Sequence, residues 1–188
     1  MGNNHEDILW IEEILKGQTD RYALLVNKYK DMLFALTMGM LKNREEAEEV
    51  SQDIFVKIFN ALPKFQHKAK FSTWMYRIAY NECISHLRKQ KPHTLSVENI
   101  SPSAFAEKED NTDEADETER KYVLLKQAIE QLHETDRGLV HFFYFDNLPV
   151  NEIAQITGLS VSNVKTKLFR IRKKLHESLK LMMEKEMA

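Results

Sequence analysis

Hydrophobic residues recur at helical spacing along most of the chain, and this pattern predicts helices separated by short polar breaks. In the N-terminal half the spacing predicts four helices, over 8–15, about 20–41, about 43–62 and about 71–90. Gly17 closes the first of these helices, and Pro63 and Pro92 follow the last two. The middle two helices carry apolar stripes made of Leu25, Val26, Tyr29, Leu33, Leu36 and Met40, and of Ala47, Val50, Ile54 and Ile58.

The C-terminal half predicts two further helices and then a helix-turn-helix. Apolar residues over 123–132 and 139–145 mark the first two helices. In the stretch LPVNEIAQITGLSVSNVKTKLFRIRKKL, a short helix leads through a turn at Gly158 into a long helix that Ser160 is placed to cap. Val164, Leu168, Ile171 and Leu175 form one apolar seam on this long helix. A helix-turn-helix places its second helix in the DNA major groove, and an ordinary helical hairpin is the alternative.

Residues 93–118 separate the two halves and predict a disordered linker. The segment is rich in Ser, Asn, Thr, Asp and Glu and has no sustained apolar period. The chain has only five Gly and four Pro, which favours helices elsewhere. We therefore expect an all-α protein of two small helical domains, over 1–92 and 119–188, joined by an acidic flexible linker.

The net charge of −2 conceals a strong asymmetry along the chain. Residues 93–119 hold nine acids and one base, a net charge of −8, so the remaining residues carry +6. The last 28 residues hold eight bases and three acids. A basic terminal helix suggests a nucleic-acid partner, and a solvated amphipathic helix is the alternative.

The fourth predicted helix and the loop before it combine basic and aromatic residues. Trp74, Arg77, Asn81, Ser85 and Arg88 share one helical face. This combination suits single-stranded nucleic acid, because basic side chains bind phosphates and unpaired nucleobases stack on aromatic rings. The alternative is a core Trp74 with solvated arginines. The predicted surface comprises Lys64, Phe65, Lys68, Lys70, Phe71, Trp74, Arg77, Asn81, Ser85 and Arg88.

The long helix of the helix-turn-helix presents a polar face opposite its apolar seam. Arg170 and the first residues of this helix are best placed to reach base edges, since an Arg pairs with guanine and an Asn such as Asn163 with adenine. The basic residues farther along this helix are expected to contact phosphates. The candidate DNA-contacting residues are Ser160, Ser162, Asn163, Lys165, Thr166, Lys167, Arg170 and Lys173.

Other classes of function find little support in the sequence. Cys83 and His86 stand three residues apart but lack further ligands or catalytic partners nearby, and there is no phosphate-binding glycine loop or nucleophile elbow. We therefore expect no enzyme activity, no metal and no cofactor. The lone Cys fits a reducing cytoplasm, no apolar run is long enough to insert in a membrane, and the N-terminus lacks the basic region of a signal peptide.

The order of these parts resembles the extracytoplasmic-function (ECF) subfamily of bacterial sigma-70 factors. AEEVSQDIFVKIF, residues 47–59, resembles the helix that docks on the β′ clamp helices of RNA polymerase, although Glu49 stands where the family usually has Asp. FSTWMYRIAYNECISHLRKQK resembles the regions that melt and read the −10 promoter element, with Met75 in place of the usual Leu. The helix-turn-helix resembles the region that reads the −35 element. The resemblance implies a polymerase-binding set of Glu49, Gln52, Asp53, Phe55 and Phe59.

The resemblance implies a sigma factor that binds core RNA polymerase, through its β′ clamp helices and its β subunit, and starts transcription. Its DNA partners would be a double-stranded −35 element and a single-stranded −10 element. The acidic linker would be either a mimic of nucleic acid or a passive tether, and an anti-sigma factor joins the candidate partners. The alternative is a helix-turn-helix regulator that does not dock on polymerase.

Overall fold

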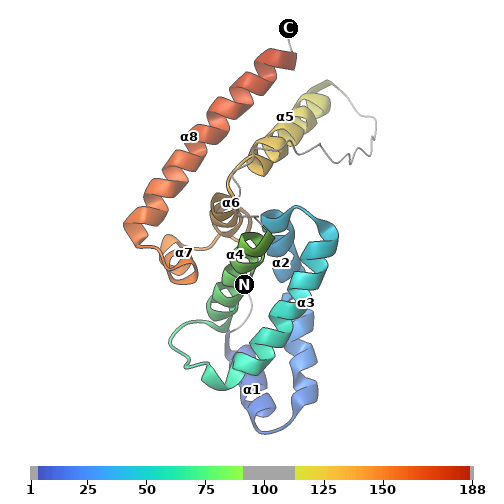
Figure 1. Ribbon diagram of the computed structural model, residues 1–188, viewed down its shortest axis with the longest axis vertical. Helices are drawn as coiled ribbons and strands as arrows, with labels where there is room; N and C mark the ends of the chain where they lie inside the picture. Colours follow the sequence, from blue (N-terminus) through green and yellow to red (C-terminus); the bar gives the residue numbers. More distant parts are fainter. Residues whose placement is uncertain (1–3, 91–112, 187–188) are drawn as a thin grey trace.

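The computed structural model describes residues 4–90 and 113–186, here called the N-terminal and C-terminal lobes (Figure 1). The N-terminal lobe contains α1 (Asn4–Leu15), α2 (Tyr22–Leu41), α3 (Arg44–Ala61) and α4 (Phe71–Gln90). Short 3-10 turns, η1 (Thr19–Arg21) and η2 (Leu62–Lys64), precede α2 and follow α3. The four predicted helices are confirmed.

Local chemistry explains where these helices begin and end. Lys42 adopts a left-handed backbone conformation with φ 64° and closes α2. The side chain of Asn43 then caps α3 by accepting a hydrogen bond of 3.2 Å from the backbone N–H of Glu46. Glu45 and Glu46 occupy the first turn of α3, where the helix dipole favours acids.

The C-terminal lobe contains α5 (Asp113–Glu130), α6 (Glu134–Val140), α7 (Val150–Thr157) and α8 (Val161–Glu186). Helix α5 begins at Asp113, so it includes residues 113–118 at the end of the predicted linker. Acidic residues are favoured in the first turn of a helix, and residues 113–118 are rich in them. The rest of the predicted linker, residues 93–112, lies outside the described residues.

The second predicted helix of this half changes its winding part-way. After α6, residues His141–Phe145 form a π-helical turn, η3, in which the N–H of Asp146 donates to the carbonyl of His141 at 3.0 Å. Phe142 is fully buried in this turn, whereas Phe145 is 59% exposed. The apolar run therefore bends away from the core at its end and does not continue as one helix.

The two lobes share one hydrophobic core. Helices α6 and α7 pack against α4, and α6 also packs against the end of α2. Figure 1 shows α6 between the N-terminal helices and the pair formed by α5 and α8. The sequence predicted two lobes but not this contact between them. Within the two described ranges, no helix is long and apolar enough to cross a membrane.

Candidate nucleic-acid interface

The predicted basic face of α4 is exposed in the structure. Arg77, Asn81 and Arg88 are exposed, and Ser85 is half-buried. Lys64, Lys68 and Lys70 extend the same basic character into the preceding loop, and all three are exposed. The polar and basic residues of the predicted set are therefore exposed on α4 and on the loop before it, apart from the half-buried Ser85.

Behind this strip, three aromatic rings form a cluster. The ring of Trp74 lies 5.1 Å from that of Phe65 and 5.8 Å from that of Phe71, between ring centroids. Phe71 is 1% exposed and Phe65 is 8% exposed, whereas Trp74 is half-buried. Trp74 is the aromatic residue of the predicted set with an accessible surface, and the two phenylalanines support it from the core.

One lysine of the predicted surface already has a partner within the chain. The ammonium group of Lys70 lies 2.5 Å from a carboxylate oxygen of Glu152, which belongs to α7 in the other lobe. The hydroxyl of Thr73 donates to the second oxygen of the same carboxylate at 3.1 Å. The acidic side chain of Glu152 thus sits at the N-terminal end of α4, where a phosphate would meet Lys70.

The helix-turn-helix has the geometry that the sequence predicts. Gly158 ends α7 with φ 73°, a left-handed conformation that glycine adopts without strain. The hydroxyl of Ser160 accepts a hydrogen bond of 3.2 Å from the backbone N–H of Asn163, which caps α8. Val164, Leu168, Ile171 and Leu175 are buried as one seam.

The predicted DNA-contacting residues of this motif lie on the outer face, opposite the seam. All of them are exposed except Lys167, which is half-buried. The ammonium group of Lys167 pairs with Asp136 of α6 at 3.2 Å. Lys167 therefore helps to hold α8 on α6 in this arrangement, and Asn163, Thr166 and Arg170 remain open to a ligand.

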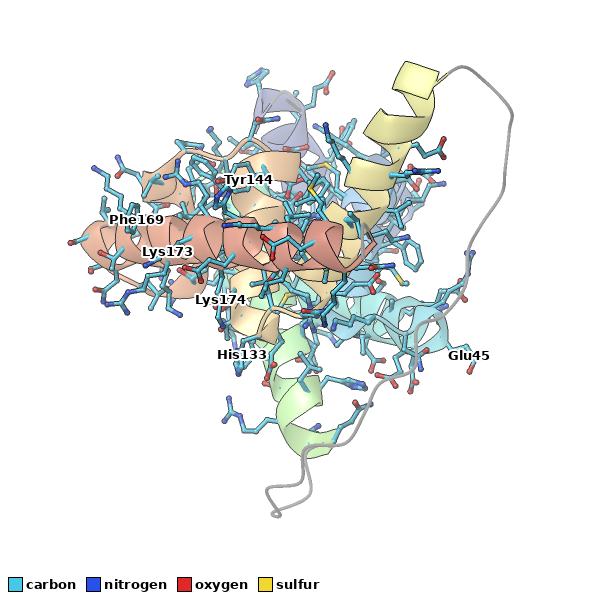
Figure 2. The ribbon with its side chains drawn as sticks, turned by 90° about the horizontal axis from the view of Figure 1, so that it is seen from above. Glu45, His133, Tyr144, Phe169, Lys173 and Lys174 are labelled. Atoms are coloured by element: carbon cyan, nitrogen blue, oxygen red, sulfur yellow. The ribbon has the colours of Figure 1, made fainter. Side chains whose placement is uncertain are left out.

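Phe169 is a residue of this face that the sequence interpretation missed. It is 66% exposed, although its side chain is large and apolar. Figure 2 shows it near Lys173 on the N-terminal half of α8. The spacing of Ser162, Thr166, Phe169 and Lys173 was a signal available in the sequence, because steps of four, three and four residues return to one helical face.

A third candidate surface lies on α3, next to the start of α2. The polar residues Glu49, Gln52 and Asp53 are exposed, and the half-buried rings of Phe55 and Phe59 lie on the same helix. These five residues are the set that the resemblance implied for polymerase binding.

An open apolar hollow of about 290 Å³ adjoins these residues, lined by Thr19, Tyr22, Phe55, Val56 and Phe59. The hydroxyl of Tyr22 donates to the carbonyl of Phe55 at 2.6 Å, and its ring meets that of Phe59 edge-on at 4.9 Å. Burial raises the pKa of Tyr22, so this hydroxyl stays protonated and donates. The sequence pattern does not single out Tyr22 or the 60% exposed Val56, because neither stands out by residue type.

Cys83 and His86, the two residues considered for metal binding or catalysis, both lie in structural contacts. Cys83 is buried in the core, and burial raises the pKa of its thiol to about 12. The Nε2 atom of His86 lies 3.2 Å from the carboxylate of Glu46. Among the residues that the structure describes, no group of three or more His, Cys, Asp or Glu is placed to hold a metal ion.

Two family profiles match the chain in order. Sigma-70 region 2 matches residues 25–93, and Sigma-70 region 4 matches residues 122–175. The ECF RNA polymerase sigma factor SigW of Bacillus subtilis is 32% identical over 177 residues, which make up 90% of this chain and 95% of the relative. The chain belongs to the ECF subfamily of sigma-70 factors.

Further relatives of this sigma factor resemble it over nearly their whole length. The RNA polymerase sigma-H factor of Pseudomonas aeruginosa is 28% identical and covers 95% of this chain and 96% of the relative. The ECF RNA polymerase sigma-E factor of Escherichia coli K12 is 29% identical, with 92% of this chain and 93% of the relative covered. Both predicted nucleic-acid surfaces fall inside the two matched regions.

Two solved structures share the fold of this sigma factor. CnrH, in complex with the cytosolic domain of CnrY, has a TM-score of 0.64 at 21% identity and covers 92% of this chain and 96% of its own. The sigma factor RpoE of Bartonella quintana, in complex with the anti-sigma factor NepR, has a TM-score of 0.66 at 20% identity, with 85% and 96% covered. The family membership and the shared fold do not favour a helix-turn-helix regulator of another class.

Proposed function

We propose that this sigma factor binds core RNA polymerase, recognises promoter DNA through its two lobes and starts transcription in the cytoplasm without chemistry of its own. The face of α4 would hold unpaired bases of the −10 element, and the face of α8 would enter the major groove of the −35 element. The observation that carries this proposal is the presence of both kinds of surface on one chain. The aromatic and basic face suits single strands, and the capped helix suits a duplex.

Within the −10 surface, each group has a distinct role. Trp74 offers a ring on which a base stacks, while Phe65 and Phe71 hold that ring from behind. Arg77, Arg88 and the loop lysines neutralise phosphates. Promoter opening would then draw on binding energy, because bases captured on Trp74 no longer pair.

Within the −35 surface, Arg170 and Asn163 are proposed to read base edges. Lys165 and Lys173 are proposed to contact phosphates, which position the helix without specifying a sequence. Ser160, Ser162 and Thr166 stand near the capped end of α8 and complete the contact surface.

The docking surface for polymerase is proposed to be the exposed part of α3. Gln52 and Asp53 offer polar contacts, and the hollow beside Phe55 and Phe59 offers an apolar one. Changing Gln52 and Asp53 together to Ala is expected to weaken core binding about tenfold, measured by fluorescence titration. Glu12→Ala on α1 together with Lys16→Ala in the turn after it is the matched control, and equal affinity of all three chains would contradict the assignment.

An anti-sigma factor is a further proposed partner, supported by the RpoE structure that contains such a factor. The experiment that tests the proposed function is run-off transcription with core polymerase on promoters from the source genome. New start sites that depend on this protein are expected. Absence of both transcription and core binding would overturn the proposal.

A further inference from the structure

The first turn of α1 holds a buried carboxylate. Asp7 is 1% exposed, and its two oxygens bind neighbouring residues of α2. The ammonium group of Lys28 lies 2.5 Å from Oδ1, and the hydroxyl of Tyr29 donates to Oδ2 at 2.6 Å. Removing a carboxylate from water is costly unless such partners compensate. The two bonds therefore fix Asp7 in place and hold the Tyr29 hydroxyl against it.

The ring of Tyr29 connects this carboxylate to the aromatic cluster of the −10 surface. Tyr29 is 3% exposed, and its ring centroid lies 5.6 Å from that of Phe71, the first residue of α4. Phe71 in turn packs against Trp74, with 5.8 Å between the ring centroids. A series of three contacts therefore leads from the Asp7 carboxylate to the half-buried ring of Trp74.

Rings packed in this way transmit small displacements from one to the next, because a close-packed interior has few voids that could absorb them. Tyr29 and Phe71 are both buried in such an interior. The stacking of a base on Trp74 depends on the distance and the tilt between two flat faces. The orientation of the stacking ring thus depends on groups that do not reach the surface.

Helix α1 contributes none of the predicted DNA-contacting residues, yet it lies against the elements that carry them. It packs against α4 and against η2, at the end of the N-terminal lobe where the loop into α4 begins (Figure 1). It also precedes residues 25–93, which the Sigma-70 region 2 profile matches. A role of α1 in the −10 surface is therefore visible in its contacts and not in the family match.

We propose that Asp7 and Tyr29 are positioning residues for the −10 surface. The carboxylate fixes the Tyr29 hydroxyl, and the Tyr29 ring holds Phe71. Phe71 then sets the orientation in which Trp74 receives an unpaired base. The inference rests on the proposed function, which assigns base capture to Trp74. Asp7 and Tyr29 act through these rings and do not touch DNA, since both are buried.

The first test observes Trp74 itself, without DNA. Trp10 and Trp74 are the two tryptophans of the chain, so Trp10→Phe leaves Trp74 as the sole reporter and keeps an aromatic ring beside Lys28. In this background, Tyr29→Phe removes one hydroxyl and preserves the ion pair of Asp7. The emission of Trp74 is expected to shift to longer wavelength and to be quenched more strongly by acrylamide, because its ring is held less closely.

Substitutions of Asp7 separate the hydrogen bond from the charge. Asp7→Asn keeps polar atoms that can bond to the Tyr29 hydroxyl, so this conservative variant is expected to retain the wild-type emission of Trp74. Asp7→Ala removes the bond and is expected to reproduce the effect of Tyr29→Phe. If Asp7→Ala does not fold, Tyr29→Phe still decides the test.

A control separates positioning from a general loss of stability. Val50 is a 3% exposed residue in the first half of α3, and the adjacent Ser51 bonds to Thr37, eight residues beyond Tyr29 on α2. Eight residues correspond to about 12 Å along a helix. Val50→Ala leaves a cavity in the core and is expected to lower the midpoint of urea unfolding. The emission of Trp74 in the folded chain is expected to stay unchanged.

The second test measures promoter opening by the holoenzyme, on a promoter identified by run-off transcription. Full stacking of one base changes binding about five- to 150-fold, and a displaced ring retains part of this gain. Tyr29→Phe and Asp7→Ala are therefore expected to slow opening about three- to tenfold, as followed by permanganate footprinting. Their affinities for core polymerase and for the −35 duplex are expected to match those of the wild type.

The outcomes separate this inference from the proposed function. Altered Trp74 emission together with slower opening in Tyr29→Phe, and neither change in Asp7→Asn or Val50→Ala, supports the positioning role. Unchanged emission, altered emission with normal opening, or the same changes in Val50→Ala would overturn it. Trp74→Ala is the reference in the same assay. If that variant also opens promoters at the wild-type rate, the proposed −10 surface itself is wrong.

Discussion

The proposed nucleic-acid face of α4 rests on aromatic rings, whereas that of α8 rests on aliphatic side chains. On α4, the half-buried Trp74 packs against the buried rings of Phe65 and Phe71. The aromatic cluster therefore extends from the core to the surface. Behind α8, the seam from Val164 to Leu175 is buried and separate from the polar face. An unpaired base needs a ring to stack on, and a groove needs only a straight helix with polar tips.

The largest expected difference between the two faces comes from replacing one phenylalanine on each of them. Phe71→Ala is expected to lower the free energy of unfolding by about 3–5 kcal/mol, because Phe71 is 1% exposed and its loss leaves a cavity. Phe169→Ala is expected to change it by less than about 0.5 kcal/mol, because Phe169 is 66% exposed. Urea denaturation followed by circular dichroism measures both. Similar losses would mean that both faces rest on their aromatic residues.

Arg170 tests whether the face of α8 reads sequence. Arg170→Ala is expected to cost about 1–3 kcal/mol on the cognate −35 duplex and less on a duplex with one base pair changed. Lys173→Ala, on the same face, is the control and is expected to weaken binding to both duplexes alike. Anisotropy titrations of the wild type and both variants on both duplexes give the affinities, and an equal loss with Arg170→Ala would make that residue a phosphate contact.

Trp74 tests whether the face of α4 captures unpaired bases. Trp74→Ala is expected to cost about 1–3 kcal/mol of stacking. The variant should impair the opening of duplex promoters more than the binding of pre-melted ones. Trp74→Phe keeps a ring and is expected to restore most of the opening rate. Permanganate footprinting of the holoenzyme measures the melted bases. Equal defects on both templates would assign Trp74 a structural role alone.

The smallest expected effect concerns the exposed ring of Phe169 on α8. An exposed ring on a groove-binding helix suits the methyl group of thymine, so replacing thymine by uracil in the −35 element should cost about 0.8 kcal/mol. The Phe169→Ala chain is expected not to distinguish the two bases. A wild-type chain that binds both duplexes equally would exclude this contact.

Helix positions followed from the sequence because their causes are local. The helix predicted to start at Phe71 or Ser72 begins at Phe71 and ends at Gln90 before Pro92, and Ser160 caps α8 as its position implied. Apolar periodicity and capping act within one or two turns, so a single sequence reveals them.

Features that depend on distant residues were missed. The spacing of Tyr76 and Tyr80 along the sequence does not predict that they pack against Phe142. Contacts among these three rings nevertheless join the two lobes. His141 and Asp146 meet at 3.5 Å only because the chain takes a π-helical turn. Burial lowers the pKa of His141 and raises that of Asp146, and burial of this kind arises from packing that no local pattern encodes.

Arg137 of α6 caps the end of α2, and this cap depends little on the side chains of the helix that it caps. Arg137 bonds to main-chain oxygens of Gly39 and Met40, and every residue type supplies such an oxygen. Position 39 is exposed and therefore tolerates substitution without loss of this contact. A change of side chain at position 39 therefore leaves the hydrogen bond to Arg137 intact, because the bond uses the main-chain oxygen alone.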